Sequence, residues 1–585
     1  MSITHHWFVA HGTPLLGHLH QAAEPGGGVG VVMVPPSGWE DVCTYRPLRA
    51  VAGVLAAAGI PVLRFDLPGT GDSAGAPHDE KLLERWIDSI AAAADELRAA
   101  TGVRDVAVMG VRLGAMIALA AAARGADVQD LILWGPQSTG RAYLRELKIF
   151  KNLEVQEYAT GEDAPPQPVP GLETAGFLLA PSTEAAIQQL NLAKLPLMTG
   201  RRVLLLSRDE VPPDAPLQQA LAGAGCQIMQ LPGTGYAGMN AIPHEAEPPA
   251  DTATAVREWL LCRAETAALP VPEHQPMPQA RVAPGVTETA LELKGNFGVL
   301  CEPAMAQAAG GWCVLFLNAG AIRHIGPGRL WVDAARRWAA RGIPSFRLDL
   351  TSIGESDGLD ERLPVELLYR EALVEEVVDA MDMLERRVGA RRFILAGLCA
   401  GAFWAFHTAV KSDRVRSAVL INPRLFFWDP EVDERRNERR SVAALAKGSA
   451  WQRVLRGEVS MDRIRRAATG FLHRLRHPLT VPQIPAEALR VAVKGIEQQR
   501  TRMLWIFTEG EPLLQELDDE KQMPDWVPCV RVKNAGHTFR PLWAQAELSR
   551  LLDQEIAATT QTYAAHGYDG SFDLCATTTI SSQRR

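Results

Sequence analysis

The sequence lacks the features that mark disulfide-rich, zinc-binding, membrane-spanning and general nucleic-acid-binding proteins. It has eight cysteines, but no two are spaced as C-x-x-C, which argues against a disulfide framework and a cysteine zinc site. No run of about 18 apolar residues predicts a membrane-spanning helix. The net charge of -8 argues against nucleic acid as a partner. The start of the chain has no basic segment followed by an apolar one, so we expect a cytoplasmic protein.

Apart from these absences, the composition is that of an ordinary globular protein, with 47% apolar and 22% charged residues. A chain of 585 residues is too long for one hydrophobic core, so two or three domains are expected.

The chain contains an internal repeat with a period of about 290 residues. Residues 59–73, G-I-P-V-L-R-F-D-L-P-G-T-G-D-S, recur at 342–356 as G-I-P-S-F-R-L-D-L-T-S-I-G-E-S. Residues 108–115, V-M-G-V-R-L-G-A, recur at 395–402 as L-A-G-L-C-A-G-A. A period of this length indicates a duplicated domain rather than a solenoid.

Short apolar strands alternate with amphipathic helices within each copy. In the first copy the pattern predicts strands at 29–34, 61–65 and 106–109, and helices at 45–58 and 80–99. This order is typical of parallel βαβ units. The sequence therefore predicts an α/β fold, with a mostly parallel sheet covered by helices on both faces.

The predicted organisation is two α/β domains in tandem. The first covers 1–268 and the second 286–556. Between them, 269–285 contains five prolines and few large apolar residues, which is typical of a linker. The last residues, 557–585, are rich in Thr and Ser and are predicted to form a tail.

A reactive turn is predicted in the second copy at Gly397-Leu398-Cys399-Ala400-Gly401, between an apolar strand and an Ala-rich segment. Glycines on both sides of one residue allow the strained turn of a nucleophile elbow, which lifts that side chain above the sheet. A buried cysteine after a strand is often only a small core residue, so this motif needs support from the rest of the chain. In the first copy the same position holds Arg112, which cannot attack a carbonyl.

With these motifs, the chain resembles the α/β-hydrolase superfamily twice over. It is most similar to serine-aminopeptidase and exosortase-associated hydrolases with R-x-D-x-x-G-x-G-x-S, over nearly the whole chain apart from linker and tail. The resemblance implies that Cys399 is the nucleophile, His537 in K-N-A-G-H-T the base, and Glu511 the acid, with Glu509 as the alternative. The order nucleophile, acid, histidine agrees with the superfamily.

The resemblance also implies an oxyanion hole made by the backbone N–H groups of Ala400 and Gly320, the latter in the loop after the strand at 312–317. Arg323, His324 and Leu398 are candidate residues lining the pocket, although the two loop residues could instead make local hydrogen bonds.

The first copy also lacks the histidine, because Tyr236 occupies that position, so this copy is predicted to be a pseudoenzyme. The aspartates of the R-x-D motif, Asp66 and Asp349, are predicted to order a loop rather than to act as the acid.

A cap is predicted at about 424–500, where hydrolases of this kind insert a lid. It holds sixteen Arg or Lys against nine Asp or Glu, in a chain whose net charge is negative. Such a segment fits the phosphates of coenzyme A or pantetheine, or the acidic face of an acyl carrier protein. The alternative is a solvated helical face. The residues proposed for this contact are Arg435, Arg436, Arg439 and Arg440.

A cysteine acyl-enzyme is itself a thioester, so loading it from another thioester is nearly isoenergetic. We therefore expect a Cys-His-Glu acyl-transfer or thioester-cleaving enzyme of specialised metabolism, without metal or cofactor. Two alternatives stay open: an ester, lactone or amide hydrolase, and a non-catalytic binding scaffold. The two copies are expected to pack as an intramolecular pseudo-dimer, because the inactive copy still buries apolar surface and the linker permits contact.

Overall fold

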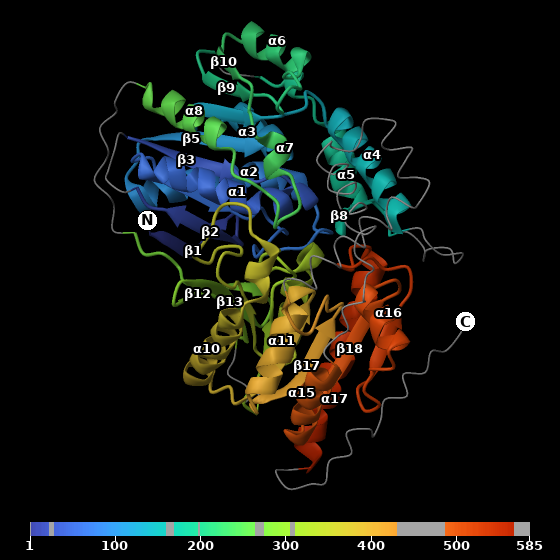
Figure 1. Cartoon of the computed structure of the whole chain (residues 1–585). Coiled ribbons are helices and arrows are strands. Elements are labelled where there is room, and N and C mark those ends of the chain that lie inside the picture. Colours follow the sequence, from blue (N-terminus) through green and yellow to red (C-terminus); the bar gives the residue numbers. More distant parts are fainter. Residues whose placement is uncertain are drawn as a thin grey trace.

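The computed structural model describes residues 2–22, 28–158, 169–196, 199–263, 274–304, 310–429 and 486–566. Within these ranges the chain forms two α/β units, each built on one large sheet with flanking helices. Figure 1 shows the first unit in blue to green and the second in yellow to red, lying against each other. The predicted fold class, two tandem α/β domains with mostly parallel sheets, is confirmed.

The first sheet has the order β1-β2-β4-β3-β5-β6-β9-β10. β1 and β2 are antiparallel to their neighbours, and the strands from β4 onward pair in parallel. All six residues of β3 are buried and five are apolar aliphatic or Met, as expected for a parallel strand covered on both faces. The strands are β1 (Ile3–Ala10), β2 (Thr13–His20), β3 (Val29–Val34), β4 (Val62–Phe65), β5 (Asp105–Val111), β6 (Asp130–Trp134), β9 (Arg202–Leu206) and β10 (Gln227–Leu231).

The first domain has helices around its sheet and a cap region, which is formed by α4, α5 and a separate two-stranded hairpin of β7 and β8. The helices are α1 (Trp39–Ala57), α2 (Leu82–Thr101), α3 (Leu113–Ala123), α4 (Gly140–Tyr158), α5 (Pro181–Gln189), α6 (Ala215–Gly223), α7 (Tyr236–Met239) and α8 (Ala250–Leu261), and the hairpin strands are β7 (Leu172–Thr174) and β8 (Phe177–Leu179).

The second sheet has the order β11-β12-β13-β15-β14-β16-β17-β18-β19, with antiparallel pairing up to β15 and parallel pairing beyond it. Its strands are β11 (Gln279–Ala283), β12 (Val286–Leu293), β13 (Asn296–Pro303), β14 (Trp312–Phe316), β15 (Ser345–Leu348), β16 (Arg392–Leu398), β17 (Val415–Ile421), β18 (Arg502–Thr508) and β19 (Cys529–Val532). Its helices are α9 (Leu330–Ala339), α10 (Glu371–Val388), α11 (Ala400–Lys411), α15 (Ala486–Gln498), α16 (Pro512–Asp519) and α17 (Leu542–His566).

Two segments differ from the sequence-based division of the chain. Residues 279–283, placed in the linker, form the edge strand β11, which pairs antiparallel with β12. The predicted tail begins inside α17, which continues to His566. The helix persists past residue 557 because Glu555 bonds Arg502 and Ser417, and Thr559 donates to Glu555 in a buried position.

The predicted cap at 424–500 is described only at its two ends. Its last part forms α15, whose buried Leu489, Val493 and Ile496 belong to the hydrophobic core of the second domain. α15 therefore packs as a helix of the domain rather than as a cap. Arg435, Arg436, Arg439 and Arg440 lie outside the described residues.

The two domains share a hydrophobic cluster. Trp7 and Leu16 of the first sheet belong to it together with Phe297, Phe316 and Trp331 of the second domain. The backbone N–H of Trp7 also donates to the carbonyl of Met277 at 2.7 Å. In Figure 1 this contact region lies where β1 and β2 face β12 and β13. The domains are thus joined by apolar burial as well as by chain connection.

Candidate active site

Cys399 occupies a sharp turn between β16 and α11. Its backbone has φ 59° and ψ -114°, a conformation that residues with a side chain rarely adopt. A Cβ on Gly397 would lie 2.1 Å from the Gly401 carbonyl oxygen, and one on Gly401 would lie 2.4 Å from that of Asn318. Both glycines are therefore required by close backbone packing, which is the physical reason for the G-x-C-x-G spacing.

His537 and Glu511 meet on loops that follow neighbouring strands, β19 and β18. His537 Nδ1 lies 2.9 Å from Glu511 Oε1, and the Glu511 side chain is nearly buried. Thr508 Oγ1 donates to the same oxygen at 3.3 Å. Glu509, the alternative acid, is exposed. The structure thus pairs the histidine with Glu511.

Asn422, at the end of β17, holds this arrangement together. Its amide nitrogen donates to the His537 carbonyl oxygen at 2.7 Å, and its side-chain oxygen accepts the backbone N–H of Thr508 at 2.7 Å. The sequence analysis missed Asn422. The available signal was a polar residue directly after a buried parallel strand, at the sheet edge where such folds place their sites.

The thiol and the imidazole favour each other's charged form. Burial opposes ionisation of Cys399 and would raise its pKa. The charge and the hydrogen bond of His537, together with the Ala400 backbone N–H, favour the thiolate more strongly, so the pKa of Cys399 is lowered. Burial likewise disfavours a charged imidazole, but Cys399 and Glu511 raise the pKa of His537. The arrangement therefore favours a thiolate–imidazolium pair, the reactive form of a cysteine nucleophile.

The loop after β14, Asn318–His324, passes beside the turn that holds Cys399. Gly320 lies in it with φ 60°, inside a tight turn closed by the Ala319–Ile322 bridge. Asn318 fixes the start of the loop, because its amide donates to Asp349 Oδ1 at 2.7 Å and its oxygen accepts the Leu350 N–H. The loop is held rigidly by the R-x-D segment of its own domain.

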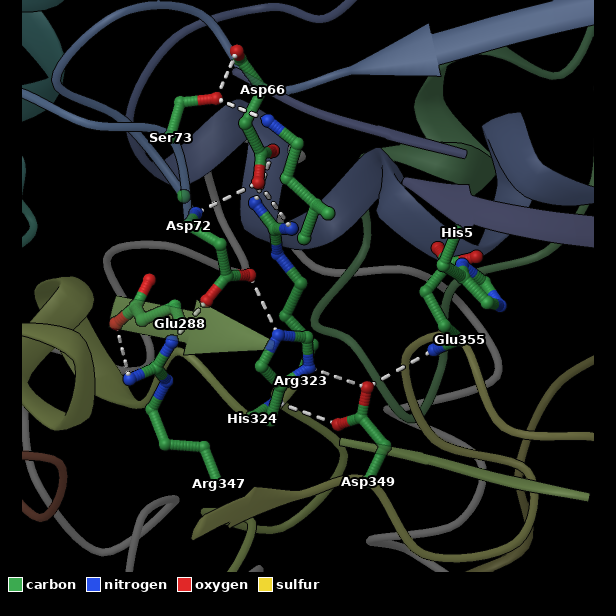
Figure 2. A network of polar contacts seen from close by, with 12 residues as sticks. His5, Asp66, Asp72, Ser73, Glu288, Arg323, His324, Arg347, Asp349 and Glu355 are labelled. Atoms are coloured by element: carbon green, nitrogen blue, oxygen red, sulfur yellow. Dashed lines mark hydrogen bonds and ion pairs between the residues drawn. The ribbon is translucent and has the colours of Figure 1, made fainter. Parts of the chain in front are cut away.

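Arg323 and His324 were predicted as candidate pocket-lining residues, and the structure places both at the domain interface instead. Arg323 is 4% exposed and donates to Asp66 at 2.9 and 3.2 Å. His324 is fully buried between two carboxylates, with Nδ1 2.7 Å from Asp349 and Nε2 2.7 Å from Asp72 (Figure 2). Their side chains are drawn there by acids of the first domain, which sequence spacing could not reveal.

The R-x-D motifs of the two domains bond each other reciprocally. Arg64 of the first motif donates to Glu355 of the second at 2.6 Å. Arg347 of the second donates to Asp72 of the first at 2.8 Å and to Glu288 at 2.9 Å. Figure 2 shows His324 between Asp72 of the first domain and Asp349 of the second, with Arg347 and Glu288 nearby. Each domain thus supplies the arginine that neutralises the other's buried acid.

The two aspartates of the motifs have the structural role predicted for them. Asp66 accepts the backbone N–H of Asp72, and Asp349 accepts that of Glu355. A Cβ on Gly71 would lie 2.0 Å from Asp66 Oδ2, so this close approach requires glycine.

Leu398, a candidate pocket-lining residue, lies in the hydrophobic core. It is fully buried at the end of β16, in the same hydrophobic cluster as Phe316 and Trp331. The side chain of Leu398 therefore packs in the core of the second domain.

Two His/Glu groups in the described part of the chain have a spacing that could hold a metal ion: His5, His18 and Glu355, and His6, Glu96 and His274. In the first group Glu355 is already bonded by Arg64 through both oxygens. In the second, both histidines lie within 2.8 Å of Glu96 Oε1. Hydrogen bonds account for both arrangements. Among the described helices, none has the length and apolar character needed to cross a membrane.

Protein-family models match one segment in each half of the chain. Residues 42–160 match the model for serine aminopeptidase, S33, and residues 310–551 match the alpha/beta hydrolase family. The chain carries two α/β-hydrolase domains in tandem. A search of curated proteins found no match.

Solved structures similar to these α/β-hydrolase domains include three of low sequence identity. Est1E from Butyrivibrio proteoclasticus with ferulic acid is 19% identical, with 44% of this chain and 97% of that chain covered and a TM-score of 0.32. The thioesterase domain from the curacin biosynthetic pathway is 16% identical, with 45% and 98% covered and a TM-score of 0.27. Proline iminopeptidase from Mycobacterium smegmatis is 12% identical, with 44% and 98% covered and a TM-score of 0.30.

The first α/β-hydrolase domain keeps the elbow but not a nucleophile. Arg112 sits there with φ 53° and ψ -115°, almost the backbone of Cys399. Its guanidinium is 3% exposed, bonds Glu40 at 3.1 Å and Glu146, and lies over the Tyr143 ring. Tyr236, at the histidine position, has its hydroxyl 3.5 Å from Glu40. The elbow of this domain holds an ion-pair cluster.

Proposed function

We propose that the second domain is a thioester-cleaving or acyl-transferring enzyme with Cys399 as nucleophile, His537 as base and Glu511 as the group that orients His537. The observation that carries this proposal is the geometry of the three groups: Cys399 stands on the strained elbow with a hydrogen bond to His537, whose Nδ1 lies 2.9 Å from Glu511 Oε1. Both matched family models describe hydrolases, and of the two matched segments it is residues 310–551 that carry a cysteine, Cys399, at the elbow.

The reaction follows from this arrangement. The Cys399 thiolate attacks the substrate carbonyl carbon, and the electron pair moves to the oxygen, which the N–H groups of Ala400 and Gly320 stabilise. The intermediate collapses and expels the leaving thiol, which takes a proton from His537. Water, an alcohol or an amine then gives a proton to His537 and attacks the acyl-cysteine. The second collapse returns the thiolate and releases the product.

A thioester substrate fits the cysteine. Exchange between two thioesters is nearly isoenergetic, and the acyl-cysteine stays reactive towards amines and alcohols. A serine would give a more stable oxygen ester. The nucleophile type therefore favours transfer or thioester cleavage over hydrolysis of ordinary esters or amides.

The first domain serves the second as a support in this proposal, and the two domains act as a pseudo-dimer. Arg112 cannot be a nucleophile, but Asp66 and Asp72 bond Arg323 and His324 of the loop that contains Gly320. The first domain thereby holds one oxyanion donor in position. This explains why a domain without a nucleophile is retained.

A carrier-bound or coenzyme A-bound acyl group is proposed as the substrate from the excess of basic residues at 424–500. Reversing Arg435, Arg436, Arg439 and Arg440 to Glu is expected to slow loading from the charged carrier about tenfold, mainly through association. An uncharged acyl thioester should react as before. Stopped-flow loading at two salt concentrations measures this, and equal slowing of both substrates would contradict a docking role.

Selective alkylation tests the proposed nucleophile. Iodoacetamide should modify Cys399 roughly tenfold or more faster than the other cysteines at neutral pH, because a thiolate is the reacting species. Burial raises the pKa of Cys43 to about 12 and also raises the pKa of Cys301 and Cys529. Mass spectrometry of peptides over time gives the rates.

The same assay separates the two acid candidates. Glu511→Gln should slow labelling of Cys399 several-fold, because His537 loses its charged partner, while Glu509→Gln should leave the rate unchanged. Equal labelling of Cys399 and the other accessible thiols would favour the binding-scaffold alternative.

A further inference from the structure

A cavity with a volume of about 760 Å³ lies in the first domain, among the described residues. This volume falls in the range of small-molecule sites. The wall is completed by the second domain, through Ile325, Gly328 and Leu542. Cys399, His537 and Glu511 are not among the described residues that line it. The cavity is therefore separate from the candidate active site.

The polar end of the cavity is balanced in charge. Arg112 bonds Glu40 and Glu146, and Arg208 bonds Glu146 at 3.0 and 3.2 Å. Burial opposes the charged form of Glu146, but the two arginines lower its pKa, so it stays ionised. Two arginines face two glutamates, and the polar end has no net charge to attract an ion of either sign.

Two buried oxygen atoms at this polar end have no hydrogen-bond partner among the described residues. They are the Tyr143 hydroxyl and Glu40 Oε2. The Tyr143 side chain is fully buried, and both residues line the cavity. A buried polar atom without a partner costs free energy, so native proteins usually supply one, and a bound molecule is one source.

The remaining lining is mainly apolar and aromatic, and its charged members include Asp41, which is paired with Arg323, and Asp333, which is paired with Arg329. Trp39 and Trp86 line the cavity together with Leu67, Leu147 and Phe177. These side chains come from different elements, namely α1, α2, the loop after β4, α4 and β8. The cavity thus combines an extended apolar wall with one hydrogen-bonding end, which is the usual composition of a site for an amphiphilic small molecule.

We propose that the first domain binds an uncharged amphiphile in this cavity, with an alkyl or aryl body and a hydroxyl or amide end. The body packs against Trp39, Trp86 and Phe177. The polar end donates a hydrogen bond to Glu40 and accepts one from Tyr143. A carboxylate would face Glu40 and Glu146, and an ammonium group would face Arg112 and Arg208, so both charged ends bind less well.

Binding of three probes of equal chain length tests the proposal: 1-decanol, decanoate and decylamine. The protein is the full-length Cys399→Ala variant, so the result does not depend on Cys399 chemistry. Tryptophan fluorescence and calorimetry follow binding, because Trp39 and Trp86 line the cavity. Decanol should bind with one-to-one stoichiometry and at least about tenfold more tightly than either ion. Absence of decanol binding, or equal binding of the three, would overturn the proposal.

Two variants and a control place the binding in the cavity. Leu147→Trp fills the space and should weaken decanol binding about tenfold or more, whereas Leu261→Trp, on an exposed part of α8, should not. Tyr143→Phe should weaken binding several-fold without lowering the melting temperature, because the hydroxyl has no partner to lose. Unchanged affinity in Leu147→Trp would show that the probe binds elsewhere and would refute the assignment.

Discussion

Replacing Cys399 by alanine is expected to lower acyl-thioester turnover by roughly 10³-fold or more, while the melting temperature stays close to that of the parent chain. The loss follows because no other group at the elbow can form the acyl intermediate, and the thiol is replaced by a smaller apolar side chain. Turnover with a small acyl thioester, measured with a thiol-reactive dye, checks the rate, and thermal unfolding checks the fold.

Cys529→Ala is the matched control, since it removes a half-buried thiol of the same domain. Burial raises the pKa of Cys529, so this thiol is a poor nucleophile, and its loss should leave turnover within about twofold. Full activity in Cys399→Ala would remove the basis of the proposed mechanism.

Cys399→Ser separates transfer from hydrolysis. The serine ester is more stable than the thioester, so transfer to amines and alcohols should be lost first, and slow hydrolysis should remain. Product analysis with an added amine distinguishes the two outcomes. If transfer survives in Cys399→Ser, the reaction does not depend on a thioester intermediate.

Asp72→Ala is expected to destabilise the chain by about 3–5 kcal/mol, since it removes one of the two carboxylates that each of the buried cations Arg347 and His324 contacts. Asp72 is fully buried, bonds Arg347 at 2.8 Å and lies 2.7 Å from His324. The variant should also slow turnover, because the loop with Gly320 loses the His324–Asp72 contact to the first domain and keeps only that of Arg323 with Asp66 and Asp41. Denaturant unfolding and kcat at a temperature where the variant is folded measure the two effects.

Asp79→Ala is the control for this prediction. It breaks an ion pair of similar length, 2.7 Å to Arg85, but both side chains are about one-third exposed and both belong to the first domain. A pair in that setting contributes about 0–1 kcal/mol. If the two variants lost the same stability, the interface network would not be important for folding. If Asp72→Ala kept full kcat, the support role of the first domain would be wrong.

The same network gives the interface a pH signature. Burial disfavours a charged imidazole, but Asp72 and Asp349 raise the pKa of His324 from 6.5 to about 10. Because the pKa of His324 is higher in the folded chain, its protonation stabilises the fold in full at pH values below the pKa of the unfolded chain. This contribution is lost as the pH rises towards about 10. The free energy of unfolding of the parent chain should therefore decrease as the pH rises from 6.5 to about 10. His324→Gln should make this decrease smaller.

Secondary structure was predictable where one local pattern dominated. The buried run at 29–34 became β3 with the predicted bounds. The helix predicted from residue 45 begins at Trp39 and contains Pro47. The proline-rich composition of 269–285 concealed β11, an edge strand, where proline nearby is tolerated.

The site was predictable where its parts are close in sequence to a strand end. Strand, glycines and nucleophile stand within five residues of each other, so the elbow at Cys399 was visible in the sequence. Glu511 and Glu509 differ by two positions, and only folding decides which one meets His537. Arg323 and His324 were visible as loop residues, but their partners in the first domain, Asp66 and Asp72, lie more than 250 positions away.

The sequence by itself determined the duplication, the α/β class, the cysteine at the second elbow and the arginine at the first, because each depends on residue type and local spacing. Only the tertiary structure decided that the two R-x-D motifs exchange their arginines. The exchange is a long-range effect, since a buried acid such as Asp72 or Glu355 needs an opposite charge and takes it from whichever chain segment packs there. The cavity beside Arg112 was likewise decided by packing, because its wall includes residues from both domains.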